Sequence, residues 1–306
     1  MAFYTPLRYP GGKGKLAKHV KSILQENNLC DGHYVEVYAG GAGIAMELLL
    51  EGYSAEIHIN DFNKSVYAFW FSLLNFTDEL CKLIQNTDVT IEERDKQKEI
   101  QNNPEQHSIL ELGFSTFFLN RTNHSGIISG GVIGGKSQEG TWKIDARFSK
   151  SALINRIECI ASKARFIHLT NLDALEFIKT NIPSLPKKSL IYFDPPYYVK
   201  GKGLYDNYYD HDDHVEVAKA VKHIKSHQWI VSYDDVDEIN LMYQGLQAIR
   251  YNLSYSAANR YKGTEVMFFS KKLSLPSLGG MNNNGRQSTV LLPCQADLTM
   301  PSTRTR

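Results

Sequence analysis

The chain of 306 residues lacks the sequence features of membrane-spanning, secreted and disulfide-stabilised proteins. No apolar run approaches the roughly 20 residues needed to cross a bilayer, and the first residues have no apolar stretch typical of a secretory signal. Only four cysteines occur, far apart and without a C-x-x-C pair, which disfavours both a disulfide framework and a zinc site. We therefore expect a cytoplasmic protein with reduced thiols, no membrane association and no bound metal.

Net charge is also nearly absent, because 34 Lys and Arg residues oppose 33 Asp and Glu residues. Nucleic-acid-binding proteins usually carry a basic excess, so the total by itself argues against such a partner. The basic residues are unevenly placed, however. Residues 1–21 carry five and no acid, and residues 121–150 carry five against two acids. Local, salt-sensitive binding of nucleic acid is therefore compatible with the neutral total.

No repeat with a period of about 20 to 50 residues occurs, which excludes solenoids and propellers. Instead, short apolar segments alternate with amphipathic ones, and this alternation predicts an α/β fold with a doubly wound, mostly parallel sheet. The first expected helix is 44–50. The expected strands are 34–38, 56–60, 165–169, 190–193, 229–232 and 266–270.

Residues 63–150 interrupt this alternation with long polar helical patterns and a glycine-rich stretch at 126–135. We interpret them as an insert of helices and a mobile loop or hairpin within a sheet domain formed by residues 1–62 and 151–272. Residues 273–306 are rich in Ser, Pro, Gly and Asn and have no sustained apolar period, which predicts a disordered tail.

The strongest chemical feature is Asp194-Pro195-Pro196-Tyr197, directly after the expected strand 190–193. In an open α/β sheet, ligands bind at the carboxyl ends of strands. Proline stiffens the turn, a carboxylate and a carbonyl can accept the two hydrogens of a planar amino group, and a tyrosine ring can stack on a heterocycle. The segment is thus a candidate adenine site. The alternative is a loop in which the Asp caps a helix and the Tyr packs.

A second candidate site is the turn after the first expected strand, which contains Tyr38, Gly40 and Gly41. Glycine there permits close approach by a nucleotide-like ligand, although such turns are common. Asp61 follows Gly40 by 21 residues and can accept hydrogen bonds from both ribose hydroxyls. The full G-x-G-x-x-G spacing and a G-K-[ST] phosphate loop are absent, so a ligand with ribose but no phosphate fits best.

A third segment, Tyr9-Pro10-Gly11-Gly12-Lys13, places an aromatic residue, a glycine pair and a lysine ahead of any strand; alone it could be a basic helix start. With these motifs in this order, the chain resembles the Dam-type (D12 class) DNA adenine N6-methyltransferases. That family places an aromatic-x-G-G-K motif, a glycine motif, a target-recognition insert and D-P-P-Y in the same sequence. The resemblance covers about residues 3–272, and segments 118–123, 145–148 and 197–205 also match.

The resemblance implies a Rossmann-like fold that binds S-adenosylmethionine, with Asp61 on its ribose. It also implies transfer of a methyl group to the N6 amino group of a flipped adenine in a specific double-stranded DNA sequence, without a metal. Asp173 is expected near the adenine of the cofactor, although an Asp there is also an ordinary N-cap. The implied catalytic residues are Asp194, Pro195, Pro196 and Tyr197. The implied cofactor contacts are Tyr9, Lys13, Tyr38, Gly40, Gly41, Asp61, Asp173 and Asp194.

DNA recognition is assigned to the insert, where basic and aromatic residues are interleaved. Arg commonly reads guanine in the major groove, and Lys commonly contacts phosphates. The glycines of the insert predict either a segment that becomes ordered on DNA or simply a flexible surface loop. The expected DNA contacts are Asn120, Arg121, Lys136, Lys143 and Arg147.

Two alternatives to this activity stay open. An N4-cytosine methyltransferase acts on a similar exocyclic amine, and a relative without catalysis could keep the fold to bind DNA. The enzyme could act alone or as the modification half of a restriction system, with a companion endonuclease for the same site. We expect a monomer encoded by a bacterium or a phage.

Overall fold

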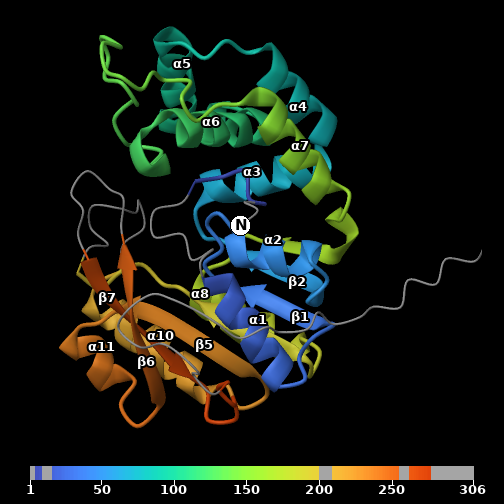
Figure 1. The fold of residues 1–306 in the computed structure, drawn as a ribbon, viewed down its shortest axis with the longest axis vertical. Helices are drawn as coiled ribbons and strands as arrows, with labels where there is room; N and C mark the ends of the chain where they lie inside the picture. The colour runs from blue at the N-terminus through green and yellow to red at the C-terminus, as the bar shows by residue number, and fades with distance from the viewer. Residues whose placement is uncertain (1–3, 9–15, 200–208, 255–261, 277–306) are drawn as a thin grey trace, which may run out of the picture.

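A seven-stranded sheet in the order β3-β2-β1-β4-β5-β7-β6 forms the centre of the computed structural model (Figure 1), which describes residues 4–8, 16–199, 209–254 and 262–276. Strands β1 to β5 are mutually parallel, and β7 runs antiparallel between β5 and β6. This confirms the predicted α/β fold with a mostly parallel sheet. The strands are β1 (Gly32–Glu36), β2 (Ser54–Asn60), β3 (Ile167–Thr170), β4 (Ser189–Phe193), β5 (Gln228–Asp234), β6 (Gln247–Ser254) and β7 (Lys262–Phe269).

Strand β6 has no counterpart among the strands predicted from the sequence. It is the edge strand of the sheet and pairs only with β7 among the described strands. An edge strand does not need the continuous apolar run of a buried parallel strand, and Arg250 of β6 is exposed. Strand β1 also begins and ends two residues earlier than expected, so Val37 and Tyr38 belong to the turn that follows it.

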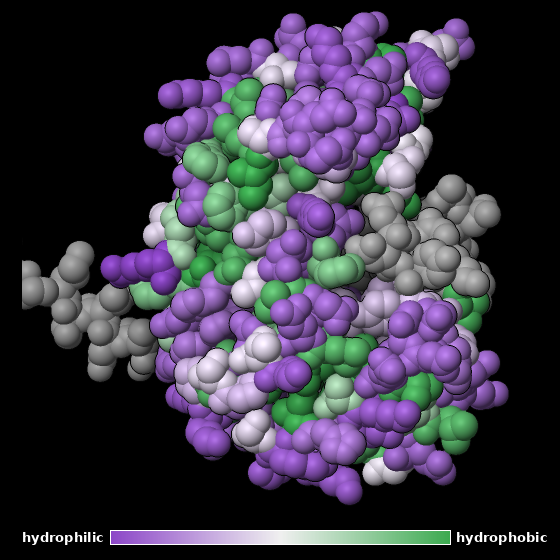
Figure 2. Space-filling model, turned by 180° about the vertical axis from the view of Figure 1, so that it is seen from behind, coloured by the Kyte–Doolittle hydropathy of each residue, from purple (hydrophilic) through white to green (hydrophobic). Residues whose placement is uncertain are grey.

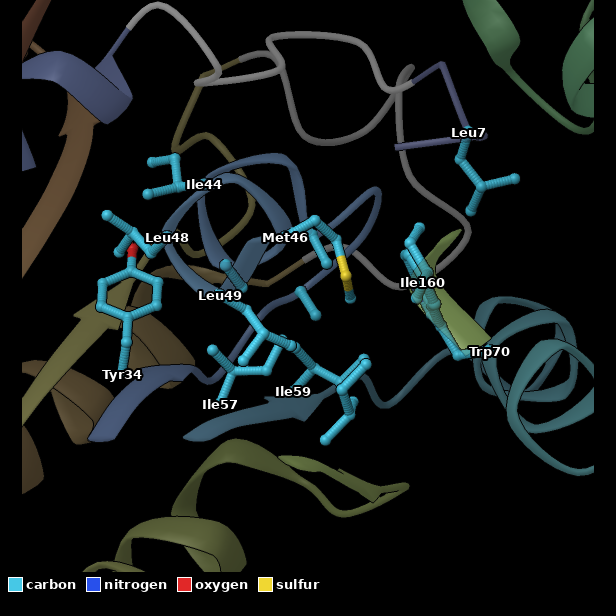
Figure 3. Packing of buried hydrophobic residues seen from close by; sticks show 14 of the residues in the cluster. Leu7, Tyr34, Ile44, Met46, Leu48, Leu49, Ile57, Ile59, Trp70 and Ile160 are labelled. Atoms are coloured by element: carbon cyan, nitrogen blue, oxygen red, sulfur yellow. The ribbon is translucent and has the colours of Figure 1, made fainter. Parts of the chain in front are cut away.

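Successive residues of the central strands point to opposite faces of the sheet, and each face has its own hydrophobic core. Tyr34 and Leu190 belong to one core, which is covered by α1 (Ala17–Glu26) and α2 (Gly43–Leu50). Figure 3 shows Met46 and Leu49 of α2 close to Ile57 and Ile59 of β2 in this core. The other core contains Val35 and Ile191 and is covered by α8 (Ala174–Thr180), α10 (His211–His223) and α11 (Asp237–Met242).

Helices dominate the insert. Figure 1 shows α4 to α7 stacked to one side of the sheet, with α3 between them and the sheet. The charged α5 buries only Arg94 and Gln97, and the top of the molecule is mostly hydrophilic in Figure 2. The helices are α3 (Lys64–Asn75), α4 (Thr77–Asn86), α5 (Ile91–Asn102), α6 (Ile109–Thr122) and α7 (Lys150–Ala161).

Between α6 and α7 lies a turn-rich stretch of residues 123–149, here called the recognition segment. A mobile loop or a hairpin was expected at 126–135. The fully described residues of this segment contain one isolated antiparallel bridge, Asn123 to Val132, and no strand. Side chains satisfy backbone carbonyls that a hairpin would pair. The Asn123 amide donates to the carbonyls of Ile127 (3.0 Å) and Ile128 (2.7 Å), and Arg94 Nη2 donates to that of Gly130 (2.9 Å). Buried Arg94 therefore organises the segment.

The packed part of the chain extends beyond residue 272, the last residue before the expected tail. Leu273 is buried, and the backbone N–H of Ser274 donates to Asn27 Oδ1 at 2.8 Å. The remainder of the expected tail, residues 277–306, lies outside the described residues. Cys81 and Cys159 are free thiols. Within the described ranges, no helix has the length and apolar character required to cross a membrane.

Candidate active site

The strand order reverses between β1 and β4, and open α/β sheets bind ligands in the crevice at such a switch point. The glycine turn follows β1 and Asp194 follows β4, so the fold brings the two strongest sequence motifs to the same edge of the sheet. The first residue of the turn is tied to the neighbouring strand, because the Val37 N–H donates to the Tyr192 carbonyl at 3.1 Å.

The glycine turn is fixed through Gly40, which has a positive φ of 48°. Its N–H donates to Asp61 Oδ2 at 2.7 Å, and its carbonyl accepts from Trp70 Nε1 at 2.9 Å. Ala42 is also left-handed with φ 46°. The sharp turn that glycine normally provides is thus made here by an alanine at the start of α2, a conformation costly for a residue with a Cβ.

Asp61 is buried at the end of β2, and both of its oxygens are oriented by the backbone. Besides the bond from Gly40, Oδ1 accepts from the Asn63 N–H at 2.9 Å. Burial raises the pKa of Asp61 to about 6, and the two backbone hydrogen bonds oppose that rise. Each carboxylate oxygen has a further lone pair, so Asp61 can still accept hydrogen bonds from a diol.

Phe62, next to Asp61, was missed in the sequence interpretation. Its side chain is 54% exposed although the ring is large and apolar. Exposed aromatic rings beside a polar anchor are frequent in ligand sites. An aromatic residue following the acid at a strand end was the available signal.

Tyr38 and Asp173 lie on the same side of the site as Tyr209. The hydroxyls of Tyr38 and Tyr209 are 3.1 Å apart. Burial raises the pKa of Tyr209 to about 12, and the charges of Asp173, Asp213 and Asp61 act in the same direction. Asp173 is also the N-cap of α8, where it accepts from the Leu175 N–H at 2.8 Å.

The carboxylate of Asp194 is oriented by the next strand. Ser232, buried near the carboxyl end of β5, donates from Oγ to Asp194 Oδ1 at 2.6 Å. The Ser232 hydroxyl in turn lies 2.8 Å from the hydroxyl of Tyr192 on β4. Through these hydrogen bonds the half-buried carboxylate of Asp194 is held just past the end of β4.

Pro195 is buried, Pro196 is half-buried, and Tyr197 is 5% exposed. The Tyr197 hydroxyl donates to Glu265 Oε1 at 2.8 Å, and Tyr251 donates to Glu265 Oε2 at 2.7 Å. Glu265 lies on β7 and was missed from the sequence; its only signal there was an acid entering an apolar strand. The ring of the D-P-P-Y segment is therefore held at its hydroxyl end.

A second carboxyl group, Glu36, lies buried behind Asp194. Its Oε1 accepts from the Ala45 N–H at 2.9 Å, which fixes the first turn of α2. Burial raises the pKa of Glu36 to about 8, and the charge of Asp194 adds to the rise. Near neutral pH the group therefore tends to be uncharged, which avoids a second negative charge beside Asp194.

The expected cofactor contacts Tyr9 and Lys13 lie outside the described residues. Arg8, just before them, is paired with the end of α6. Its N–H donates to Asn120 Oδ1 at 2.7 Å, and Asn120 Nδ2 donates to its carbonyl at 2.6 Å. Asn120 is 3% exposed. The structure thus places this expected DNA contact in the interior, as a link between the N-terminal segment and the insert.

The half-buried side chain of Arg121 also forms hydrogen bonds within the protein. Its Nε donates to the Arg147 carbonyl at 2.7 Å, and its Nη1 donates to the Pro6 carbonyl at 3.3 Å. The side chains of Lys136, Lys143 and Arg147 are exposed on the recognition segment. Within the described residues, no three His, Cys, Asp or Glu side chains are grouped so that they could hold a metal ion.

A model of the D12 class N6 adenine-specific DNA methyltransferases matches residues 9–257. No curated protein shows significant similarity in sequence. The rRNA methyltransferase aviRa from Streptomyces viridochromogenes is 13% identical, with 89% of this chain and 90% of that chain covered and a TM-score of 0.37. A SAM-dependent methyltransferase from Agrobacterium tumefaciens is 10% identical, with 83% of this chain and 61% of that chain covered and a TM-score of 0.37. The putative methyltransferase yhhF from Escherichia coli is 10% identical, with 83% of this chain and 85% of that chain covered and a TM-score of 0.30.

Proposed function

We propose that this chain, which belongs to the D12 class of N6 adenine-specific DNA methyltransferases, methylates the N6 amino group of adenine in a specific sequence of double-stranded DNA. The observation that carries the proposal is the position of Asp194-Pro195-Pro196-Tyr197 at the sheet switch point, beside the glycine turn. A carboxylate with a fixed orientation and a neighbouring carbonyl suit an exocyclic amine.

The glycine turn and Asp61 fit S-adenosylmethionine. A diol can bind to the free lone pairs of Asp61, whose orientation is set by Gly40 and Asn63. The exposed ring of Phe62 offers an apolar face for an adenine. Tyr38, Gly41 and Asp173 complete the proposed contacts, with Tyr9 and Lys13 on the N-terminal segment. When bound, S-adenosylmethionine supplies a methyl group attached to a sulfonium sulfur. A nitrogen lone pair can attack the methyl carbon, and the sulfur is then the leaving group.

The amino group of a paired adenine is inaccessible inside the duplex, so the base must be flipped out, at a cost of a few kcal/mol. Asp194 and the Pro195 carbonyl accept the two amino hydrogens, which directs the nitrogen lone pair away from them. The proton that the nitrogen loses on methylation can pass to the Asp194 carboxylate. Ser232 keeps this carboxylate in one orientation, so much of the contribution is positioning.

Tyr197 is the proposed stacking partner of the flipped base, with Pro196 next to it in the stiff turn. Its hydroxyl bond to Glu265 restricts the plane of the ring. Asp234 supports the turn that follows, because its carboxylate accepts from the N–H groups of Tyr198 at 2.9 Å and Val199 at 3.1 Å. DNA contacts are proposed for the exposed side chains of Lys136, Lys143 and Arg147.

One experiment tests the activity directly. Mixed-sequence DNA is incubated with the protein and S-adenosylmethionine labelled in the methyl group, and the DNA is then digested and its nucleosides separated. We expect label in N6-methyladenine within one sequence context. An Asp194→Ala variant serves as the control for background methylation.

Label no higher than in the Asp194→Ala control would contradict the proposal. Label in N4-methylcytosine would replace it with the cytosine reaction, which uses the same kind of amine. DNA binding without label in any nucleoside would identify a DNA-binding relative without catalysis.

A further inference from the structure

Three arginines converge where the N-terminal segment meets the insert. Arg8 and Arg147 line the same cavity of about 360 Å³. Arg121 bridges the two segments that carry them, since it donates to the carbonyls of Arg147 and Pro6. The guanidinium of Arg8 is itself oriented, because Nη1 donates to the Asn123 carbonyl at 3.1 Å. We call Arg8, Arg121 and Arg147 the arginine cluster.

In the part of the chain that the structure describes, no carboxylate forms an ion pair with this cluster. Among the ion pairs of the described residues, none involves Arg8, Arg121 or Arg147. The recognition segment has two acids, Glu139 and Asp145, and both are exposed. The hydrogen bonds of the cluster go to backbone carbonyls, which satisfy N–H donors but do not remove the net positive charge.

Burial and then mutual repulsion lower the pKa values of two members of the arginine cluster. Burial lowers the pKa of Arg121 to about 9, and repulsion from Arg8, Arg156 and Arg147 lowers it further in that order. The pKa of Arg8 is lowered by burial and then by Arg147. Arrangements of like charge oppose folding, so an anion that binds between these groups relieves repulsion as well as forming charge-assisted hydrogen bonds.

The cavity beside the cluster is open to an extended ligand. Trp142, which is 64% exposed, forms part of its wall, and the Arg147 guanidinium lies over the Trp142 ring at 5.6 Å from the centroid. Exposed His124 also lines it. An exposed Trp next to basic groups suits a ligand that combines phosphate with flat, apolar surfaces.

We propose that the arginine cluster is a docking site for a backbone phosphate of nucleic acid, with Arg8 and Arg147 in contact with the phosphate and Arg121 fixing their separation. The inference rests on the proposed function. It assigns the phosphate contact to Arg8 of the N-terminal segment together with Arg147 of the recognition segment. Asn120 ties the backbone of Arg8 to the insert, so phosphate bound at this cluster also restricts the chain entering the N-terminal motif.

The test measures binding of a non-specific DNA duplex as a function of salt, without S-adenosylmethionine. The slope of log K against log salt is about −0.9 per phosphate contact. Because both arginines contact the same phosphate, we expect Arg8→Gln combined with Arg147→Gln to reduce the magnitude of the slope by about one, and Arg147→Gln alone to reduce it by less. Arg165→Gln is the matched control, because Arg165 is exposed and stacks on Phe166 at 4.5 Å, away from the cluster; its slope should equal that of the unmodified protein.

A slope that is unchanged in the folded double variant overturns the proposal, and thermal melting shows whether the variant is folded. Inorganic phosphate at equal ionic strength is the second probe. If it binds saturably and the double substitution abolishes this binding without altering the duplex slope, the cluster is a small-anion site and the DNA assignment is wrong. The salt titration measures DNA binding and not methyl transfer. Reduced slopes in a protein that labels no nucleoside would therefore support the docking site and contradict only the proposed activity.

Discussion

The hydroxyl of Tyr197 donates to Oε1 of Glu265 at 2.8 Å, which joins the D-P-P-Y segment to the last strand of the sheet. The same carboxylate accepts from Tyr251 through its other oxygen. In the proposed function Tyr197 stacks on the flipped base, and a hydrogen bond at the far end of the ring holds the ring in position. Glu265 is therefore a positioning residue for Tyr197.

Tyr197→Phe should keep the stacking ring but lose this restraint. We expect turnover to fall roughly threefold to tenfold, since removing a net hydrogen bond costs on the order of 1 kcal/mol. The measurement is single-turnover methylation at saturating DNA. Tyr251→Phe removes the partner bond to Glu265 and should leave turnover closer to normal; an equal loss in both variants would show that ring orientation is not the cause.

Asp194→Asn replaces an acceptor with a group that presents N–H donors to the amino group of the base. Loss of an oriented polar group in an active site typically costs about 100-fold to 1,000-fold in rate, and we expect a loss of that size with an unchanged melting temperature. Ser232→Ala removes only the orienting bond to Asp194, so its loss should be on the order of tenfold. A Ser232→Ala enzyme as slow as Asp194→Asn would point to a direct role for the serine.

Asp61→Ala should weaken the binding of S-adenosylmethionine by about tenfold or more, because the two proposed hydrogen bonds to the ribose and the orientation of Gly40 would be lost together. Isothermal titration calorimetry without DNA gives the affinity. Asp88→Ala, at an exposed position between α4 and α5, provides the comparison. Equal affinities for the two variants would place the cofactor elsewhere.

Glu36 predicts a specific pH dependence of stability. Its folded pKa of about 8 lies above the ordinary value of 4.5, so between these values the folded protein binds more protons than the unfolded one. Its contribution to stability is complete below about pH 4.5 and is lost as pH rises through about 8. Glu36→Gln keeps an acceptor for Ala45 and should remove this part of the decline, by up to a few kcal/mol.

Urea denaturation of Glu36→Gln and of the unmodified protein between pH 5 and pH 9 would measure the effect. The difference between the two unfolding free energies should shift in favour of the variant as pH rises, whatever the other groups contribute. A difference that stays constant over this range would mean that Glu36 is already ionised in the folded protein.

The sequence predicted the sheet well because buried parallel strands form continuous apolar runs, as in Leu190 to Phe193. It also placed Asp61 and Asp194 at strand ends, where the structure finds them. Edge strand β6 escaped prediction because it needs no such run. The order of β7 between β5 and β6 could not be inferred either, since strand order depends on long-range pairing that leaves no local pattern.

The insert was harder to interpret from composition. Asn120 and Arg121 were both expected to contact DNA. In the structure they hydrogen-bond to backbone groups more than 100 residues away in the chain, at Arg8 and Pro6. Glycines at 126–135 predicted a mobile loop or a hairpin but not the contacts found there, where Arg94 from α5 and the Asn123 amide bind backbone carbonyls. Side-chain contacts to distant backbone carry no signal in residue type or spacing.

The position of β7 bears on the order in which the protein can be completed. Because β7 separates β5 from β6, strand β6 has no neighbour in the sheet until residues 262–269 have been synthesised. The glycine turn, Asp61 and the D-P-P-Y segment precede β7 in the chain, but Glu265 is synthesised only as part of β7. A chain released by the ribosome before residue 262 would thus contain every sequence motif and still be unable to finish its sheet, so truncated products should not compete with the complete enzyme.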